Sequence, residues 1–425
     1  MGMTLAEKFL ARASGKDVVR PGDIVLPDAE LTIVHDGYVL SAHRQLSEIG
    51  YTAITNPERV VFVTDHQVVY TSPASIAQGN ANRRIAREWK VGRFYAAGSG
   101  GHGHIFPMEE GLVRPGMFLF AYDAHCTNFG AIGAFALRLG PNVVAALATG
   151  TCWTVVPHSV RIDLKGALSD GVHPRDIGFW LSGELTSGRL GIDFDYRVVE
   201  FGGTFADNLP LAGRVALCNT LTEIGVLNIL FNPLSPVGAL RDASWIEADK
   251  GALYEHRIEL DISALGPQVA LPGGPDRAVT VGQAAGTRID HAYIGACGSG
   301  MYDDFAAAAA LLKGRRVAEH VRFIVVPGTV NLAKRLASEG LLEVFMDAGA
   351  IIMPPGCGPC AGGVGGPLGP GEVSISTAAT NGAGRMGAKD ALCYLGSPLT
   401  VTASAIAGHI VDPRVLVALS EPAFD

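Results

Sequence analysis

The sequence predicts an α/β protein in which buried parallel strands alternate with helices. Two apolar runs, residues 59–64 and 117–121, are continuous rather than alternating, which is typical of strands buried on both faces of a parallel sheet. Strand-like and helix-like segments alternate along the whole chain, and this alternation favours α/β domains. Because the chain has 425 residues, two to four domains are expected.

The expected elements follow from hydrophobic periodicity and turn residues. In chain order they are a helix over 5–13, strands over 31–35 and 59–64, a helix over 75–89, strands over 117–121 and 159–164, a helix over 208–226, a strand over 292–294, a helix over 303–313 and a strand over 323–327. The pattern changes near two positions, so we predict three domains, at 1–156, 157–289 and 290–425.

Composition and charge exclude several classes of protein. The net charge of -8 and the lack of a basic stripe argue against a general nucleic-acid binder. The most apolar stretch, 131–156, is interrupted by Arg138 and Pro141, so no transmembrane helix is expected. The N-terminal segment is charged and amphipathic, unlike a signal peptide. Seven cysteines in a chain without a recognisable signal peptide favour reduced thiols and a cytoplasmic protein.

Acidic and histidine side chains follow two of the predicted strands directly. Asp65 and His66 end the run 59–64, and Asp123 and His125 follow the run 117–121. Ligands of α/β sheets bind beyond the carboxyl ends of the strands. These residues are therefore candidates for acid–base chemistry, although each pair alone could equally cap a strand end.

Three cysteines form the strongest chemical signal. Cys357 and Cys360 lie three positions apart in a Gly/Pro-rich turn, and Cys297 directly follows a predicted strand. Three thiolates from two loops suit an iron–sulfur cubane in which one iron has no protein ligand. Such an iron can act as a Lewis acid, as other open metal sites do.

Other interpretations of the Cys-x-x-Cys turn stay open at this point. A redox pair is one, although such a pair usually opens a helix and Ala361 leads into a glycine-rich stretch. A structural zinc site is another, although no fourth ligand lies nearby in sequence. We expect Cys152, Cys218 and Cys393 to be buried small hydrophobic residues, and we leave the role of Cys126 open.

With these motifs the chain resembles the aconitase superfamily, most closely the large subunits of 3-isopropylmalate dehydratases. The resemblance covers nearly the whole chain and includes the segments 112–116, 130–136 and 148–150 as well as the cysteine motifs. It implies an aconitase-like fold of three α/β/α domains around a central cluster, without the swivelling fourth domain. It also implies that Cys297, Cys357 and Cys360 hold a [4Fe-4S] cluster and that a separate small subunit is needed.

The resemblance also assigns further site residues. The positions that match catalytic residues of the family are Asp65, His66, His104, Asp123, His125 and Glu223. The positions that match substrate-binding residues are His35, Ala124, Asn219, Thr380 and Arg385. Asn219 and Glu223 are four residues apart, which places them on one face of a helix. We expect His43, His102, His158, His173 and His291 to be surface or structural residues.

Several positions depart from the family pattern. Ala124 stands where the family has serine, and Gly298-Ser299 stands where it has Thr-Asn. Thr380 replaces an arginine, whereas Arg385 keeps one. An arginine–carboxylate fork is geometrically specific, so its loss predicts a non-standard substrate pocket and argues against a housekeeping role in leucine synthesis.

The resulting prediction is an iron–sulfur hydro-lyase subunit that dehydrates a small hydroxy-acid related to isopropylmalate, with rehydration to an isomer as a further step. Two alternatives from other classes stand beside it. One is a regulatory RNA-binding protein that has lost the cluster, which the acidic balance disfavours. The other is a homologue that binds a different metal or serves as a scaffold.

Overall fold

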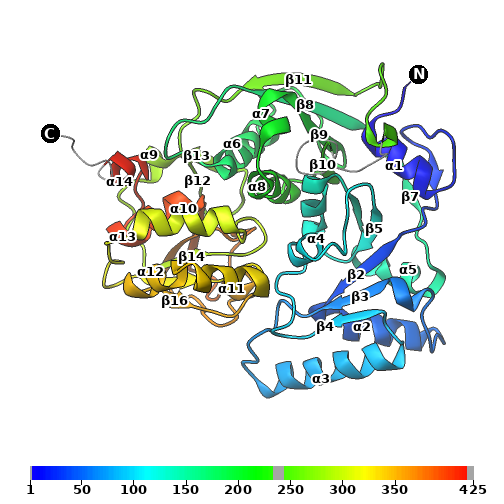
Figure 1. The fold of residues 1–425 in the computed structure, drawn as a ribbon, viewed down its shortest axis with the longest axis horizontal. Coiled ribbons are helices and arrows are strands. Elements are labelled where there is room, and N and C mark those ends of the chain that lie inside the picture. The colour runs from blue at the N-terminus through cyan, green and yellow to red at the C-terminus, as the bar shows by residue number, and fades with distance from the viewer. Residues whose placement is uncertain (1, 233–243, 419–425) are drawn as a thin grey trace. The chain divides into compact units, whose positions relative to one another are not determined.

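The computed structural model describes residues 2–232 and 244–418, and the chain divides into two compact units (Figure 1). Unit 1 consists of the described parts of Met1–Lys165, Ile192–Leu211 and Gly225–Leu260, and unit 2 of those of Gly166–Gly191, Ala212–Ile224 and Asp261–Asp425. Each unit contains parallel strands and helices, so the predicted α/β class is confirmed.

The first sheet of unit 1 is entirely parallel and has the strand order β4-β3-β2-β5-β6. Its strands are β2 (Leu31–His35), β3 (Val60–Val63), β4 (Arg93–Tyr95), β5 (Phe118–Ala121) and β6 (Phe135–Arg138). Every residue of β3 and β5 is buried, as the continuous apolar runs predict. Helices α2 (Asp36–Glu48) and α3 (Pro73–Glu88) lie next to each other along this sheet (Figure 1).

The second sheet of unit 1 has the order β10-β9-β8-β11, and β8–β9 and β9–β10 are parallel pairs. Its strands are β8 (Ser159–Lys165), β9 (Val198–Gly202), β10 (Asn228–Phe231) and β11 (His256–Asp261). Gly130 makes close packing on β10 possible, because a Cβ atom there would lie 1.7 Å from the carbonyl oxygen of Ile229.

The remaining elements of unit 1 have at most nine residues, and among them α1 fills the predicted range and begins with a Thr4–Glu7 capping box. They are α1 (Leu5–Ala13), β1 (Ile24–Val25), η1 (Pro57–Arg59), α4 (Phe106–Glu109), η2 (Ala124–Ile132), η3 (Gly140–Asn142), α5 (Val143–Thr149), β7 (Thr154–Val155), α7 (Gly203–Asn208) and η4 (Ser244–Ile246). Strands β1 and β7 form an antiparallel pair.

Unit 2 contains a seven-stranded sheet with the order β13-β12-β18-β17-β14-β15-β16, antiparallel at β12 and parallel elsewhere. Its strands are β12 (Gln268–Ala270), β13 (Ala278–Thr280), β14 (His291–Ile294), β15 (Arg322–Val325), β16 (Ile351–Ile352), β17 (Val373–Ser376) and β18 (Leu392–Gly396). Strands β12 and β13 precede the domain boundary predicted at 289/290 but pair within this sheet, and the three-domain division stays a prediction.

The helices of unit 2 include two neighbouring pairs, α10 with α13 and α11 with α12 (Figure 1). Their bounds are α6 (Pro174–Thr186), α8 (Leu211–Thr222), α9 (Val281–Ala284), α10 (Tyr302–Leu312), α11 (Val330–Ser338), α12 (Leu341–Asp347), η5 (Gly358–Cys360), α13 (Pro398–Ala407) and α14 (Arg414–Ala418). None of the helices in the described ranges has the length and apolar content needed to cross a membrane.

Helix α8 is shorter than the predicted helix over 208–226. It begins after Pro210 and ends at Thr222, and Gly225 with φ 104° continues the turn that follows. Every residue from Ala212 to Thr222 is buried, so α8 is an interior helix rather than an amphipathic one. Glu223 therefore lies just beyond the helix end.

Candidate functional site

Each unit contains one group of polar side chains near strand ends. In unit 1, His35 ends β2, Asp65 lies two residues after β3, and Asp123 lies two residues after β5. Because these strands are parallel, their carboxyl ends meet at one edge of the sheet. The histidine–aspartate cluster comprises His35, Asp36, Asp65, His66, His102, His104, Asp123 and His125.

Asp65 is the fully buried acceptor at the centre of this cluster. His35 Nδ1 donates to its two oxygens at 3.0 and 3.1 Å, and the Gly103 amide donates at 2.8 Å. Burial alone would raise the pKa of Asp65, but the charges and hydrogen bonds of His35 and His66 lower it well below its usual range. Asp65 is therefore an ionised carboxylate.

His66 lies between two carboxylates. Its Nδ1 is 2.8 Å from Asp65 Oδ1 and 3.1 Å from Asp36 Oδ1. Asp36 also accepts the amide protons of His66 at 3.3 Å and Gln67 at 2.9 Å, which fixes the loop after β3. Burial alone would lower the pKa of His66, but Asp65 and Asp36 raise it well above its usual value. The His66 side chain is 23% exposed, so this imidazolium can meet a substrate.

His35, a predicted substrate-binding residue, lies in the interior. Its exposed fraction is 0%, and its ring centroid is 4.4 Å from that of His104. Burial alone would lower the pKa of His35, and the charge of Asp65 raises it above its usual value. His35 therefore contacts Asp65 rather than solvent. The ligand atoms of His35, Asp65 and His66 lie within 4.8 Å of one another, so this group could also hold a metal ion.

Asp123 organises the second half of the cluster. It begins η2 by accepting the His125 amide at 2.9 Å, and its Oδ1 is 3.1 Å from His125 Nδ1 and 3.7 Å from His104 Nε2. Burial would raise the pKa of Asp123, but the His125 hydrogen bond and the neighbouring histidines lower it well below its usual range. Burial, followed by the charge of His35, lowers the pKa of His104 well below its usual value, so His104 is neutral.

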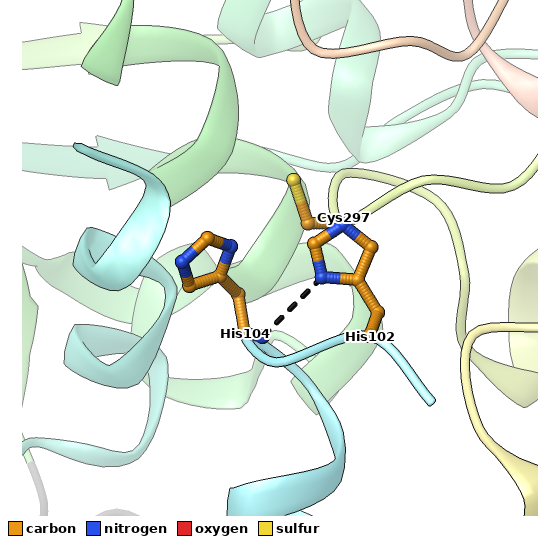
Figure 2. A group of neighbouring side chains, drawn as sticks. All are labelled: His102, His104 and Cys297. Atoms are coloured by element: carbon orange, nitrogen blue, oxygen red, sulfur yellow. Dashed lines mark hydrogen bonds between the residues drawn. The ribbon is translucent and has the colours of Figure 1, made fainter. Parts of the chain in front are cut away.

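His102 belongs to the same cluster, although no sequence pattern distinguishes it from the other histidines. Its Nδ1 accepts the His104 amide at 3.3 Å, which Figure 2 shows as a dashed line, and lies 3.6 Å from Asp65 Oδ2. Burial lowers the pKa of His102 to about 4. A neutral imidazole whose Nδ1 accepts must carry its proton on Nε2.

The group in unit 2 contains the three predicted cluster cysteines. Cys297, also labelled in Figure 2, follows β14 through Gly295 and Ala296, and Ala296 has φ 59°. Cys357 and Cys360 flank the short turn η5. All three thiols are buried, with exposed fractions of 3%, 5% and 5%. The cysteine site comprises Cys297, Cys357, Cys360, Asn219, Arg175 and Arg385.

The side chain of Tyr293 lies close to the cysteines. Tyr293 is fully buried in β14, and its hydroxyl donates to the carbonyl oxygen of Cys357 at 2.9 Å. Burial raises the pKa of Tyr293 well above its usual value, and the charges of Cys360, Cys357 and Cys297 raise it further. Tyr293 also packs with Cys297 and Cys360 in one cluster of buried residues.

Polar side chains contact the thiols directly. Asn219 Nδ2 donates to Cys297 Sγ at 3.0 Å, and Arg385 Nη2 lies 4.0 Å from Cys360 Sγ. Burial would lower the pKa of Arg385, but the charges of Cys360 and Glu223 are among those that raise it. The structure thus places Asn219 and Arg385 beside cysteine thiols, and Glu223 is close enough for its charge to act on Arg385.

Thr380 and Ala124, two further predicted substrate-binding residues, are both half-buried. Thr380 is half-buried in the loop after β17, next to Asn381, whose amide donates to the carbonyl oxygens of Leu271 and Cys393. Ala124 is half-buried between Asp123 and His125 in η2. The predicted roles of these residues in binding stay predictions.

Arg175 is a residue of the cysteine site that the sequence analysis missed. It lies at the start of α6 and is fully buried, and its guanidinium donates to Ser299 Oγ and to the carbonyl oxygen of Ala378. Ser299 is 124 residues from Arg175 along the chain, so no local pattern reveals the contact.

Comparisons with known proteins found a matching protein family and similar large subunits. A family model described as the aconitase family (aconitate hydratase) matches residues 16–237 and 282–408. The 3-isopropylmalate dehydratase large subunit 1 of Methanopyrus kandleri is 38% identical over 97% of this chain and 99% of that protein. The probable methanogen homoaconitase large subunit of Methanothermobacter thermautotrophicus is 36% identical over 97% of this chain and 98% of its own length.

A solved structure extends the similarity at the level of the fold. The crystal structure of aconitase X from Thermococcus kodakaraensis in its holo-form aligns with a TM-score of 0.50. The alignment covers 83% of this chain and 84% of that one, at 12% sequence identity. At this identity the likeness is one of architecture.

Proposed function

Because the chain belongs to the aconitase family and is thus a hydro-lyase, we propose that it is the large subunit of an enzyme that dehydrates a small 2- or 3-hydroxy carboxylic acid. The substrate that we propose is related to isopropylmalate. Dehydration removes hydroxide and a proton from neighbouring carbons and leaves an unsaturated acid. Addition of water to that acid in the opposite sense would complete an isomerisation.

The observation that carries this proposal is the set of three buried thiols around Tyr293. Three buried cysteines from two loops suit a [4Fe-4S] cluster, and such clusters are held by thiolates. The amide donor of Asn219 and the cation of Arg385 both favour negative charge on sulfur. When bound by Cys297, Cys357 and Cys360, the cluster would supply an iron without a protein ligand that polarises the substrate hydroxyl.

His66 is the proton donor in this proposal. Since Asp36 and Asp65 both accept at Nδ1, the imidazolium keeps its second proton on Nε2. The two carboxylates hold the pKa of His66 well above its usual value although burial opposes them, so the donor is charged at neutral pH. A positioned acid of this kind can protonate a departing hydroxide.

His104 and His125 play a different part. Asp123 orients His125 through Nδ1, and His104 stays neutral because burial lowers its pKa. Neutral and carboxylate-bound imidazoles orient a hydroxyl group by hydrogen bonds without adding a second mobile positive charge. We assign them to substrate orientation and His66 to proton delivery.

The proposed substrate class follows from the charges of the residues that match substrate-binding positions of the family. Arg385 offers a guanidinium for a carboxylate, whereas Thr380 and Ala124 offer no charge. Arginine forks recognise carboxylates far more strongly than neutral groups do. We therefore propose a substrate that presents a neutral group to Thr380.

A partner subunit completes the proposal. The relatives from Methanopyrus kandleri and Methanothermobacter thermautotrophicus are named large subunits. We propose that a separate small subunit supplies the base that removes the proton next to the carboxylate. The chain alone should then bind the cluster and show negligible turnover.

The test is anaerobic reconstitution of the chain with iron and sulfide. We expect about four iron and four sulfide atoms per chain and an absorption band near roughly 400 nm, as for iron–sulfur thiolate centres. Cys357→Ser should lose most of this iron. Cys393→Ser is a matched control, because Cys393 is a buried cysteine in the same hydrophobic cluster as Cys297 and Cys360.

Two outcomes would refute the proposal. One is a wild-type chain that takes up no sulfide. The other is equal iron content in Cys357→Ser and Cys393→Ser, since the bound iron would then lie elsewhere.

A further inference from the structure

The last turns of α3 and the start of β4 border an open pocket of about 480 Å³ in unit 1 (Figure 1). The lining of this basic pocket includes Arg83, Arg87, Lys90, Val91 and Phe94. Its volume lies in the usual range for pockets that hold small organic ligands. None of its lining residues belongs to the histidine–aspartate cluster, so the basic pocket is a separate feature of unit 1.

Three cations line the basic pocket. Arg83 and Arg87 are four residues apart on α3, and Lys90 follows seven residues after Arg83, which brings all three to one face of the helix. Arg87 and Lys90 are exposed, and Arg83 is half-buried. Like charges at this spacing repel one another and disfavour the helix. A bound anion would relieve this repulsion.

The three cations have no acidic partner. In the part of the chain that the structure describes, none of them forms an ion pair with a carboxylate, and Arg83 Nη1 donates to the neutral Asn80 Oδ1 at 3.4 Å. Glu88 is the one acidic residue of α3. Its Oε2 accepts from Arg84 Nη1 at 3.0 Å, and its Oε1 lies 3.1 Å from His43 Nε2. The carboxylate of α3 therefore serves other groups.

Lys90 occupies a position at which glycine is usual. It follows the C-cap residue Trp89 of α3, and its φ is 53°, in the left-handed region. The Val91 amide donates to the Ala86 carbonyl oxygen at 2.9 Å, which is the hydrogen bond of a Schellman motif. Glycine is favoured at the residue after the cap in this motif, because it has no Cβ atom. The chain thus keeps a lysine at the basic pocket where a glycine would end the helix with less strain.

Two other pockets contain acids as well as bases. In unit 1, Arg12 shares a pocket of about 200 Å³ with Asp28 and Glu30. In unit 2, both Arg316 and Glu343 line a pocket of about 350 Å³. The lining of the basic pocket contains no acid, so its positive charge is left for a ligand.

The side chains of the basic pocket indicate the chemistry of this ligand. Arginine guanidinium groups bind phosphate or carboxylate through paired hydrogen bonds, and a lysine adds a point charge. Val91 and Phe94 are half-buried and offer apolar surface beside the cations. An aromatic ring such as that of Phe94 can also pack against a flat group.

We propose that the basic pocket binds a small organic polyanion, which carries phosphate or carboxylate groups and an apolar part. The cations Arg83, Arg87 and Lys90 would bind the anionic groups, and Val91 and Phe94 would contact the apolar part. This proposal is independent of the proposed function, since the pocket needs neither an iron–sulfur cluster nor a small subunit.

The test is isothermal titration calorimetry of the cluster-free full chain at low salt in EDTA. The probes are ADP, benzenetricarboxylate and inorganic pyrophosphate. ADP and benzenetricarboxylate distinguish phosphate from carboxylate, and pyrophosphate carries charge without an apolar part. We expect at least one of the two organic probes to bind with a Kd below about 1 mM and about fivefold or more tightly than pyrophosphate.

Matched variants locate the bound anion. Arg87→Gln and Lys90→Gly each remove one charge from the basic pocket and should weaken binding of the organic probe by about fivefold to tenfold. Lys90→Gly should fold at least as stably as the wild type, because glycine adopts the left-handed conformation without strain. Arg84→Gln removes the same charge from the same helix, but Arg84 pairs with Glu88 outside the pocket. This control should keep the affinity within about twofold.

Three results would overturn the proposal. The first is no binding of either organic probe at about 10 mM, and the second is equal affinity for pyrophosphate and the organic probes. The third is a loss of affinity in Arg87→Gln and Lys90→Gly no larger than in Arg84→Gln, since the anion would then bind elsewhere. A chain that binds the probe as expected but takes up no iron and sulfide would refute the proposed function alone.

Discussion

The two units neutralise buried charge in different ways. In unit 1 the partners are titratable, and carboxylates such as Asp65 share their charge with His35 and His66 through short hydrogen bonds. In unit 2 the groups that contact the thiols are the amide of Asn219 and the guanidinium of Arg385, and the guanidinium stays charged at physiological pH. Unit 1 is therefore suited to proton transfer, whereas unit 2 is suited to holding negative charge.

The largest effect is expected in unit 2. Cys357→Ser should lower turnover of the chain assembled with the proposed small subunit by at least about a thousandfold, because an open metal contributes several kcal/mol of transition-state stabilisation. Steady-state kinetics of the assembled enzyme would measure this. Cys218→Ala, which alters a buried cysteine on α8, should keep most of the activity. Comparable losses in both variants would contradict the assignment of Cys357 as a ligand.

The next effect belongs to unit 1. His66→Gln should reduce kcat by a few hundredfold, within the usual range for a general acid. Iron content should not change, since His66 is not among the cysteine-site residues. His43→Gln is the matched control, because His43 pairs with Glu88 outside the histidine–aspartate cluster. If His66→Gln keeps full kcat or loses the iron, the division of roles between the units is wrong.

The stability of the chain should reveal the neutral histidine in unit 1. Because the pKa of His102 in the folded chain is about 4 and its ordinary value is 6.5, His102 contributes stability above pH 6.5 that is lost as the pH falls through 4. The loss is on the order of 3 kcal/mol, and the His102→Asn chain should lose correspondingly less. Urea unfolding of the cluster-free chain between pH 7 and 4 would measure the difference.

His35 and His66 do not obscure this window. Burial alone would lower their pKa values, but the charges and hydrogen bonds of the neighbouring carboxylates together raise them, so their contributions are complete below pH 6.5 and are lost only at higher pH. Identical acid limbs for wild type and His102→Asn would show that His102 is not held in its neutral form.

The smallest effect concerns Asp36. Asp36→Asn keeps the size of the side chain but removes one of two negative charges at His66 Nδ1, and kcat should fall by about tenfold or less. Asp36 helps to raise the pKa of His66 against the effect of burial. The variant should therefore lose activity at a lower pH than wild type as the pH rises. A pH profile of kcat with an unmoved alkaline limb would count against this role.

Much of the fold and part of the site could be predicted from the sequence, because their signals are local. The continuous apolar run over 59–64 predicts the strand β3, and Asp65 and His66 follow this run directly in the sequence. The turn that contains Cys357 and Cys360 was equally local. Helix α8 was predicted too long, because a helix buried on all sides shows no amphipathic edge that would mark its end.

The residues that were missed depend on tertiary contacts. His102, which we expect to be a surface or structural residue, is buried in the loop before α4 at 3.6 Å from Asp65 Oδ2. Arg175 meets Ser299 and Ala378 only after α6 packs in unit 2. Gly298 and Ser299 depart from the family pattern, and both accommodate that arginine. Gly298 leaves space for the guanidinium, and Ser299 accepts a hydrogen bond from it.

The most direct test of the central claim is the position of iron in crystals of the anaerobically reconstituted chain, located by anomalous diffraction at the iron edge. The account predicts one compact iron peak bonded to the thiols of Cys297, Cys357 and Cys360. A peak at His35, Asp65 and His66 instead, or iron bonded to fewer than the three cysteines, would contradict it.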